Sequence, residues 1–297
     1  MTRRQKGIFY AFLAALIYGV TFTIAKDVMK IHIPSFALTL MRVSGAATIF
    51  WLISLGLPKD NIEKKDYRKF FIAAVFGIAL NMMTFLKGLS YTTPISASVL
   101  MITAPIFVMI FSFIFLRNPI TKYKIAGVFL GMAGATVLIL YGKKLNIHAS
   151  NPKLGNLLVV FNAISYALYL ILAKPLLNRY HPVTFAKWLY TFGLFLILPF
   201  CLPEFMHLNW ANIPLHIHLK IVFLVVFSTV LTYLFNLIAL KVLKPTTMSV
   251  FIYLQPLIAT IFAMMMGADQ LTWIKIIAAG LIIIGVYLVN LSSIKKN

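Results

Sequence analysis

The sequence predicts an all-α integral membrane protein, with ten transmembrane helices that form two inverted five-helix repeats. Three observations lead to this prediction. Hydrophobic residues make up 61% of the 297 residues and charged residues only 11%, which is too few to cover the surface of a soluble protein of this size. Apolar stretches long enough to span a membrane recur along nearly the whole chain. The two halves of the chain also share prolines, lysines and glycines at near-constant spacing.

A membrane-spanning helix needs about 20 predominantly apolar residues. The sequence contains ten such stretches, near residues 7–26, 35–56, 69–88, 93–116, 123–141, 154–174, 183–203, 219–240, 246–267 and 271–292. They use most of the chain, so we expect no separate soluble domain. A transmembrane β-barrel is excluded, because its alternating segments of about 10 residues are absent.

The first apolar stretch follows the basic residues Arg3, Arg4 and Lys6, as the core of a signal peptide would. Its apolar run is longer than such a core, no pattern of small residues typical of a cleavage site follows, and Lys26-Asp27 ends it. We therefore predict that it is the first membrane span.

Lysine and arginine total 27, against six acidic residues, which gives a net charge of +21. This charge alone would suggest a nucleic-acid partner, but in so apolar a chain it indicates basic residues that flank membrane spans. With the N-terminus in the cytoplasm, 17 of the 27 fall on the inner side and 7 on the outer side. We predict a multi-pass protein of the cytoplasmic (inner) membrane with both termini cytoplasmic, and no nucleic-acid partner.

The chain repeats itself internally. At an offset of 151 residues, prolines, a lysine and a glycine align as Pro94 with Pro245, Pro105 with Pro256, Lys124 with Lys275 and Gly134 with Gly285. In the first spans the offset is 148, and it aligns Gly7 with Gly155, Tyr18 with Tyr166, Lys26 with Lys174 and Pro34 with Pro182. We predict one repeat over residues 1–147 and a second over 148–297. Because each repeat has five spans, the second enters the membrane from the other side, as in many secondary transporters.

Three short motifs carry a resemblance to a known family. The first span contains ALIYGVTF at 15–22, followed by Lys26, Pro34 and Arg42, and the fourth contains ASVLMITAP at 97–105. The sequence around Gln255-Pro256 repeats the second motif, and the third motif lies at the end of each repeat, at residues 118–121 and 269–272. In these motifs and in their order the chain resembles the EamA type of the drug/metabolite transporter superfamily, over nearly its whole length.

Two departures from the family pattern accompany this resemblance. Tyr18 stands where the family usually has tryptophan. At the end of each repeat the family usually carries a glutamate before a Leu-Thr pair, whereas this chain has Asn118 in the first copy and Asp269 in the second. Any role that needs both acids is therefore not expected here. The resemblance implies that spans 1, 3, 4, 6, 8 and 9 line a central cavity, and that amino acids or related compounds are moved, commonly outward.

Polar and aromatic residues recur at helical spacing in the central spans, where a buried amide has no water and needs a protein or substrate partner. The residues that we predict to bind substrate are Tyr18, Phe22, Arg42, Asn81, Phe85, Asn162, Tyr166, Tyr169, Tyr233, Asn236, Tyr253 and Gln255. Hydrogen bonding between helices is the alternative role for each of them.

Two prolines lie within spans at equivalent depth, Pro105 in the first repeat and Pro256 in the second. Proline removes a backbone donor and clashes with the preceding turn, so it kinks a helix. We predict a hinge or cavity-shaping kink at both sites, with a static packing kink as the alternative. Gly127 and Gly131, four residues apart, predict close helix packing.

Arg42 is the most informative charge. If the second span enters from the outer side near Ser35, Arg42 lies about 10 Å deep at 1.5 Å per residue. A cation within the membrane is a candidate for function. It could equally extend to the outer interface or bond to exposed carbonyls, and the sequence leaves both open.

The predicted spans contain no aspartate or glutamate. Many proton-driven carriers relay protons through buried carboxylates. We therefore expect gradient-driven movement or exchange without a carboxylate relay.

The sequence predicts no cofactor, no metal site and no catalytic residues. Three histidines, His207, His216 and His218, share one loop but lack a clear fourth ligand. Neither a phosphate-binding glycine-rich loop nor a nucleophile–base pattern is present. The expected partners are a small-molecule substrate and the lipid bilayer, in a monomer or homodimer.

These observations predict a secondary transporter, not an enzyme, that exports a small organic metabolite by alternating access. Two alternatives remain open, a carrier of anionic or phosphorylated metabolites, which Arg42 suggests, and a lipid-carrier flippase. A receptor or membrane enzyme is a third, against which the repeat argues.

Overall fold

The structure is a computed structural model that describes residues 1–31, 33–141, 150–265 and 272–294, and these residues form helices and short connections without a strand. Within these ranges, ten helices, some of them built from several segments, are long and apolar enough to cross a membrane. This confirms the predicted all-α membrane architecture with ten spans.

Six of the spans are single helices. They are α1 (Arg3–Ile31), α2 (Ser35–Leu55), α7 (Lys122–Tyr141), α8 (Pro152–Leu177), α9 (Pro182–Met206) and α14 (Trp273–Ile294). Several extend beyond the apolar stretch that predicted them, and α1 begins four residues earlier, at Arg3. The reason is that a helix continues into polar residues at the membrane surface, where its backbone remains hydrogen-bonded.

The other four spans are built from segments. The third consists of α3 (Lys64–Ala74), the π-helical η1 (Val75–Ala79) and α4 (Leu80–Tyr91), and the eighth of α10 (Leu215–Val225), the π-helical η3 (Val226–Leu231) and α11 (Thr232–Val242). The fourth consists of α5 (Pro94–Met101) and α6 (Ala104–Leu116), and the ninth of α12 (Pro245–Ser249), the 3₁₀ segment η4 (Val250–Tyr253) and α13 (Leu254–Met265). A further 3₁₀ turn, η2 (Trp210–Asn212), lies between α9 and α10.

The interruptions fall at corresponding places in the two halves. The π-helical segments begin at Val75 and Val226, which are 151 residues apart, the offset of the sequence repeat. The break before α6, at residues 102–103, corresponds at this offset to residues 253–254, the junction between η4 and α13. Each break lies just before a proline, Pro105 or Pro256, where the sequence predicted a kink. The proline itself lies in the first turn of the helix that follows, where a missing N–H group is tolerated.

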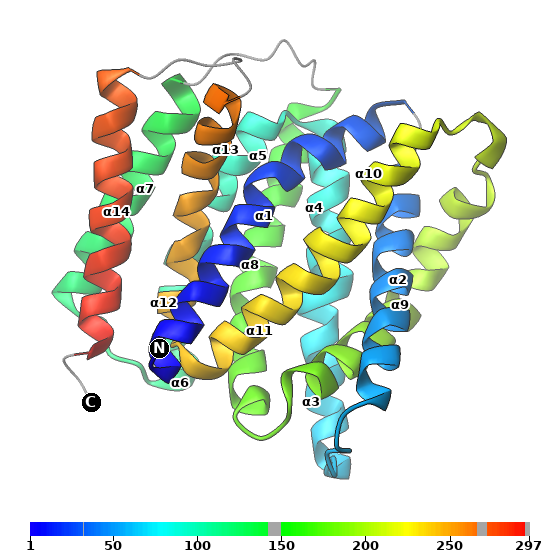
Figure 1. Cartoon of the computed structure of the whole chain (residues 1–297), viewed down its shortest axis with the longest axis horizontal. Coiled ribbons are helices and arrows are strands. Elements are labelled where there is room, and N and C mark those ends of the chain that lie inside the picture. The colour runs from blue at the N-terminus through cyan, green and yellow to red at the C-terminus, as the bar shows by residue number, and fades with distance from the viewer. Residues whose placement is uncertain (32, 142–149, 266–271, 295–297) are drawn as a thin grey trace.

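Four helices of the first half each pack against a helix of the second half. α4 packs against α8 and α1 against α11, while α2 packs against α9 and α7 against α14. In Figure 1, α7 and α14 lie side by side at one edge of the bundle. A Cβ added to Gly127 would lie 2.6 Å from the carbonyl oxygen of Gly285, so these two helices approach backbone to backbone, as predicted for Gly127.

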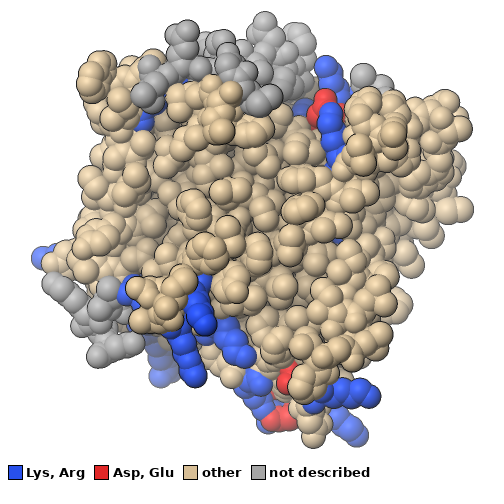
Figure 2. Space-filling view, viewed as in Figure 1, with Lys and Arg blue, Asp and Glu red and all other residues tan. Residues whose placement is uncertain are grey.

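The surface of the bundle is divided into bands. The start of α1 and the end of α14 lie at one end, which we call the terminus end (Figure 1). Lysine and arginine side chains gather at this end of the molecule, and the band between the two ends is almost uncharged (Figure 2). Large apolar side chains such as Phe115, Phe195 and Ile277 are exposed on the sides of the bundle. Such a surface is suited to a bilayer rather than to water.

Candidate functional site

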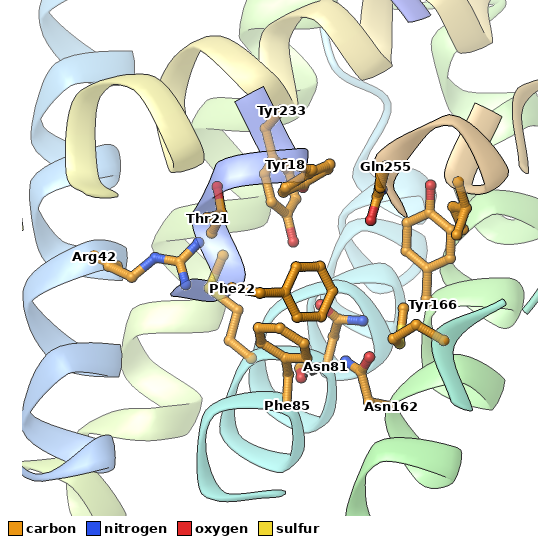
Figure 3. A pocket seen from close by; sticks show the side chains of 13 residues that line it. Tyr18, Thr21, Phe22, Arg42, Asn81, Phe85, Asn162, Tyr166, Tyr233 and Gln255 are labelled. Atoms are coloured by element: carbon orange, nitrogen blue, oxygen red, sulfur yellow. Dashed lines mark hydrogen bonds between the residues drawn. The ribbon is translucent and has the colours of Figure 1, made fainter. Parts of the chain in front are cut away.

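A central cavity lies between the helices and is lined by residues from both halves of the chain (Figure 3). Its volume is about 80 Å³, which accommodates several water-sized molecules. Its lining consists of Tyr18, Thr21, Phe22, Arg42, Asn81, Met82, Phe85, Met101, Asn162, Tyr166, Tyr233, Ile252 and Gln255. These residues come from spans 1, 3, 4, 6, 8 and 9, as the resemblance implied, and from span 2, which contributes Arg42.

The structure brings together nine of the twelve residues predicted to bind substrate. They are Tyr18, Phe22, Arg42, Asn81, Phe85, Asn162, Tyr166, Tyr233 and Gln255. Tyr169 and Asn236 line a small adjoining pocket, which shares Tyr18, Tyr166 and Tyr233 with the central cavity. Side chains distant in sequence converge here because helices of both halves pack around the same cavity.

Tyr253 lies apart from this group. Its side chain is fully buried, at 0% exposure, and its ring packs against α7. A Cβ on Gly131 would lie 2.3 Å from Cδ2 of Tyr253, so the glycine makes the space that the ring occupies. Tyr253 ends the 3₁₀ segment η4, whose tighter winding changes the direction of its side chains from that of an α-helix. The neighbouring Ile252 and Gln255 reach the cavity instead.

Aromatic rings form much of the cavity wall. Phe22 of α1 and Phe85 of α4 meet edge to face, with ring centroids 5.3 Å apart (Figure 3). Tyr169 lies between Tyr166 and Tyr233, at centroid distances of 6.4 and 6.3 Å. These distances are within the range for favourable aromatic pairs. These ring contacts therefore stabilise the walls of the cavity, and the hydroxyl groups of the tyrosines remain near it.

The π-helical segment η1 offers backbone carbonyls to side chains of other helices. The Tyr233 hydroxyl donates to the Gly77 carbonyl at 2.9 Å, and Ser165 donates to the Phe76 carbonyl at 2.7 Å. One turn further on, Asn162 Nδ2 donates to the Asn81 carbonyl at 2.7 Å. A π-helical turn disturbs the regular hydrogen-bond ladder and leaves carbonyls that need other donors. The segment thus ties span 3 to spans 6 and 8 beside the cavity.

Two buried polar atoms near the cavity have no hydrogen-bond partner among the residues that the structure describes. They are Oδ1 of Asn162 and the hydroxyl of Tyr169. Asn162 is 2% exposed and lines the cavity directly. A buried acceptor without a donor is costly, so such atoms are suited to contact a bound molecule.

Arg42 lies at one side of the cavity, with its guanidinium directed toward Thr21 and Phe22 (Figure 3). Its side chain does not extend to the membrane surface, because the residue is only 4% exposed. Nε donates to the Thr229 hydroxyl at 2.9 Å, and Nη2 approaches the Ser228 hydroxyl at 3.4 Å. Both acceptors are neutral and belong to η3, the π-helical segment of the second half.

Several residues of the cavity and its surroundings were not predicted from the sequence. Met82, Met101 and Ile252 line the cavity, but apolar residues in apolar spans give no signal of such a role. Ser228 was missed as a partner of Arg42 because the π-helical turn shifts the register that α-helical spacing assumes. Thr21 also lines the cavity, and its hydroxyl lies 3.1 Å from that of Ser228.

Lysines at two corresponding positions bind helix ends away from the cavity. Lys26 Nζ donates to the carbonyls of Leu89 and Ser90 at 2.8 and 2.9 Å, at the C-terminal end of α4. Lys174, its counterpart, donates to Leu240 and Lys241 at the end of α11, at 2.7 and 3.0 Å. The last carbonyls of a helix lack intrahelical donors, so a lysine there acts as a cap.

Acidic residues of the described chain lie at the ends of the bundle. Glu63 and Asp66 pair with Arg179, Asp27 pairs with Lys220, Glu204 pairs with Lys87, and Asp60 accepts from the backbone of His181. Asp269 lies outside the described residues. Over the described ranges, no three histidine, cysteine or acidic side chains are placed to hold a metal ion.

The cavity presents hydroxyls, amides, aromatic rings and one guanidinium, which are groups that can bind a polar solute. Ten apolar helices around such a cavity define a membrane transporter fold. The EamA-like transporter family matches residues 5–140 and again residues 153–291. The chain belongs to this family, as its motifs suggested.

Relatives and a solved structure agree with this assignment. An uncharacterized transporter of Archaeoglobus fulgidus is 30% identical over 93% of this chain and 96% of its own length. The uncharacterized transporter YyaM of Bacillus subtilis is 24% identical, over 92% of this chain and 89% of its own. One crystal structure superimposes with a TM-score of 0.77 at 17% identity, covering 98% of this chain and 99% of its own, which establishes the shared fold alone.

Proposed function

We propose that this chain is a secondary transporter that moves a small organic metabolite of the amino-acid class out across the cytoplasmic membrane by alternating access. The observation that carries the proposal is the central cavity, which side chains of both family-matching stretches line. Secondary transporters bind their substrates where two repeats meet. The transporter family of the chain and the names of its relatives support transport as the activity.

Alternating access is supported by the matched interruptions of the two halves. Spans 3 and 8 both contain a π-helical segment, and spans 4 and 9 are both broken beside Pro105 and Pro256. Interrupted helices at corresponding positions of two repeats point to the binding site in such transporters. In this proposal the halves are inverted repeats, and they rock around the cavity with these breaks as hinges.

The orientation follows from the distribution of basic residues. The terminus end carries most of the lysines and arginines (Figure 2). Positively charged loops remain in the cytoplasm during membrane insertion. We therefore place the terminus end, and with it both termini, on the cytoplasmic side.

Energy coupling in this proposal needs no carboxylate relay. The lining of the central cavity includes no acidic side chain among the described residues. The substrate then moves down its own gradient or in exchange for a second solute. The outward direction and the amino-acid class come from the resemblance to the EamA type, and the polar groups of a small cavity suit such a solute.

The test is counterflow in liposomes that contain the purified protein, screened with labelled amino acids, nucleosides, polyamines and sugar phosphates. We expect saturable counterflow of one or more amino acids. A bulky variant, Asn81→Trp, should abolish it by filling the cavity, and Thr48→Trp on the exposed face of α2 should not. Everted membrane vesicles then give the direction.

Absence of flux for every soluble class would overturn the proposal. It would favour the lipid-carrier flippase, which labelled lipid in the same liposomes would reveal.

A further inference from the structure

We propose that the Arg42 guanidinium binds a single carboxylate group of the transported solute, and that Asn162 accepts a hydrogen bond from an N–H group of the same solute. This inference rests on the proposed function, and it names the chemistry that the cavity recognises. It predicts a solute with one carboxylate and one nitrogen donor.

Arg42 is a buried cation without an acidic partner. It is 4% exposed and lies in the cavity wall, where the described lining contains no other charged side chain. The acidic residues of the described chain are at the ends of the bundle, bonded to other groups. A buried charge without a counter-ion is strongly unfavourable. An anionic group that enters the cavity would supply the missing charge.

Two hydroxyls hold the guanidinium in place. Thr229 donates its own proton to the Leu224 carbonyl at 2.6 Å, so its oxygen is free to accept from Arg42 Nε. Ser228 accepts from Arg42 Nη2 and also bonds to the hydroxyl of Thr21, whose own proton goes to the Ile17 carbonyl at 2.9 Å. A guanidinium has five N–H groups. Two are used here, so the others are available to a bound group, and the paired N–H geometry matches a carboxylate.

The single positive charge of the cavity lining favours an anion with one negative charge. One guanidinium balances one negative charge, which a carboxylate carries. A phosphate monoester carries close to two negative charges at neutral pH, and no second cation lies in the described lining to balance the excess. A polyamine would add positive charge beside Arg42. The observations therefore favour a monocarboxylate over both.

Asn162 supplies the second contact. Its Nδ2 donates to the Asn81 carbonyl, and since a carbonyl only accepts, this bond fixes which side of the amide carries Oδ1. Oδ1 is buried and has no donor within the described residues. Figure 3 places Asn162 and Arg42 on different sides of the labelled cavity. A solute that spans the cavity can thus meet a donor at one end and an acceptor at the other.

The experiment compares each of the twenty standard L-amino acids with its own amide, which lacks the carboxylate. Binding is measured by thermal shift titration of the purified full chain, since a ligand of the folded state raises its Tm. We expect at least one amino acid to bind, and its amide to bind about 10- to 100-fold more weakly, the range for a hydrogen bond to a charged group. This comparison in the wild-type protein needs no variant to fold.

Single substitutions then show which side chain binds the carboxylate of the solute and which binds its N–H group. Arg42→Gln should weaken the amino acid about 10- to 100-fold but should not weaken its amide, which lacks the carboxylate and carries a positive charge that Arg42 repels. Asn162→Leu should weaken the amino acid but not the corresponding carboxylic acid without its amine. Thr48→Val, on the exposed face of α2, is the control and should change neither.

Equal affinity for an amino acid and its amide in the wild-type protein would overturn the inference, and so would an equal loss for both in Arg42→Gln. If only nucleosides, polyamines or sugar phosphates bind or move, the inference fails while transport through the cavity stands. If no soluble compound moves in the liposomes either, the proposed function itself has failed.

Discussion

Arg42 of α2 donates a hydrogen bond of 2.9 Å from Nε to the hydroxyl of Thr229 in η3. The two residues are 187 positions apart in the chain, so the bond joins span 2 of the first half to span 8 of the second. The π-helical winding of η3 directs the Thr229 proton to Leu224, five residues back, and leaves the lone pairs for Arg42. The bond thus orients the one charged side chain found in the cavity wall among described residues.

Thr229→Val should weaken substrate binding by misplacing the guanidinium. Valine has a similar shape but accepts no hydrogen bond, so a buried N–H of a cation loses its partner. The loss is about 1–3 kcal/mol, which corresponds to roughly 5- to 150-fold in the dissociation constant. Thermal shift titration of the purified variant with its substrate measures the change.

Thr48→Val on α2 is the matched control for this prediction, because Thr48 is exposed and its hydroxyl bonds only within its own helix. An unchanged dissociation constant in Thr229→Val would show that the hydroxyl does not position Arg42.

Gly77→Ala should destabilise the protein. A Cβ at Gly77 would lie 2.4 Å from Cδ2 of Tyr169, so the ring or η1 would have to move. Overpacking of this kind reduces the free energy of unfolding by about 1–3 kcal/mol. Thermal unfolding in detergent should therefore show a lower Tm.

Gly280→Ala in α14 provides the control, since nothing lies within 4 Å of its added Cβ. That variant should be neutral or stabilising by up to about 1 kcal/mol, because alanine favours a helix over glycine. Equal losses of Tm in both variants would contradict the close contact between Gly77 and Tyr169.

The number of spans and most of the cavity wall were predictable from sequence because both depend on periodicity and apolar length. Tyr18 and Tyr166 stand out as tyrosines on faces of apolar helices, and both line the cavity. Such signals survive wherever a span is a regular α-helix.

Prediction was less complete where the helix is not regular. Tyr253 ends a 3₁₀ segment and faces α7, although α-helical spacing had placed it with the cavity residues. Ser228 lies in a π-helical segment, whose position no residue type signalled. These shifts result from tertiary packing between the halves, which the periodicity of a single span does not contain.

Lys174→Met should destabilise the protein by removing the cap of α11. The ammonium donates to two carbonyls, those of Leu240 and Lys241, and methionine retains the length of the chain without a donor. We expect a loss of about 1–2 kcal/mol, seen as a lower Tm. Lys26→Met should have a similar effect at the end of α4, because Lys26 caps it in the same way.

Lys153→Met, at the exposed start of α8, is the control for both lysine variants. A Tm for Lys174→Met or Lys26→Met as high as that of the control would mean that these caps do not stabilise the fold.

Asp66→Asn should weaken the connection between the first turn of α3 and the loop that precedes α9 at the terminus end. Asp66 is 0% exposed and accepts from Lys69 at 2.8 Å, from the Tyr180 hydroxyl at 2.7 Å and from Arg179. Loss of hydrogen bonds to a buried carboxylate should lower the free energy of unfolding by about 1.5–3 kcal/mol.

Glu63→Gln removes the other acidic partner of Arg179, but its side chain is 44% exposed. An exposed pair contributes about 0–1 kcal/mol, so its Tm should stay close to that of the wild-type protein. Denaturation of both variants in the same detergent makes the comparison, and a larger loss for Glu63→Gln would contradict the assignment of Asp66 as the buried anchor.

If the substrate passes through the central cavity, chemical blockage of that cavity should stop transport. The chain has one cysteine, the buried Cys201, so a Cys201→Ser background carries no other thiol. Thr21→Cys places a thiol in the cavity wall, and Thr48→Cys places one on the exposed face of α2. Both variants are reconstituted in liposomes, treated with a methanethiosulfonate reagent, and assayed for counterflow of the transported amino acid. We predict that the reagent abolishes counterflow in Thr21→Cys, that excess substrate slows this inactivation, and that Thr48→Cys is unaffected. Full counterflow after complete modification of Thr21→Cys would show that the substrate does not pass through this cavity.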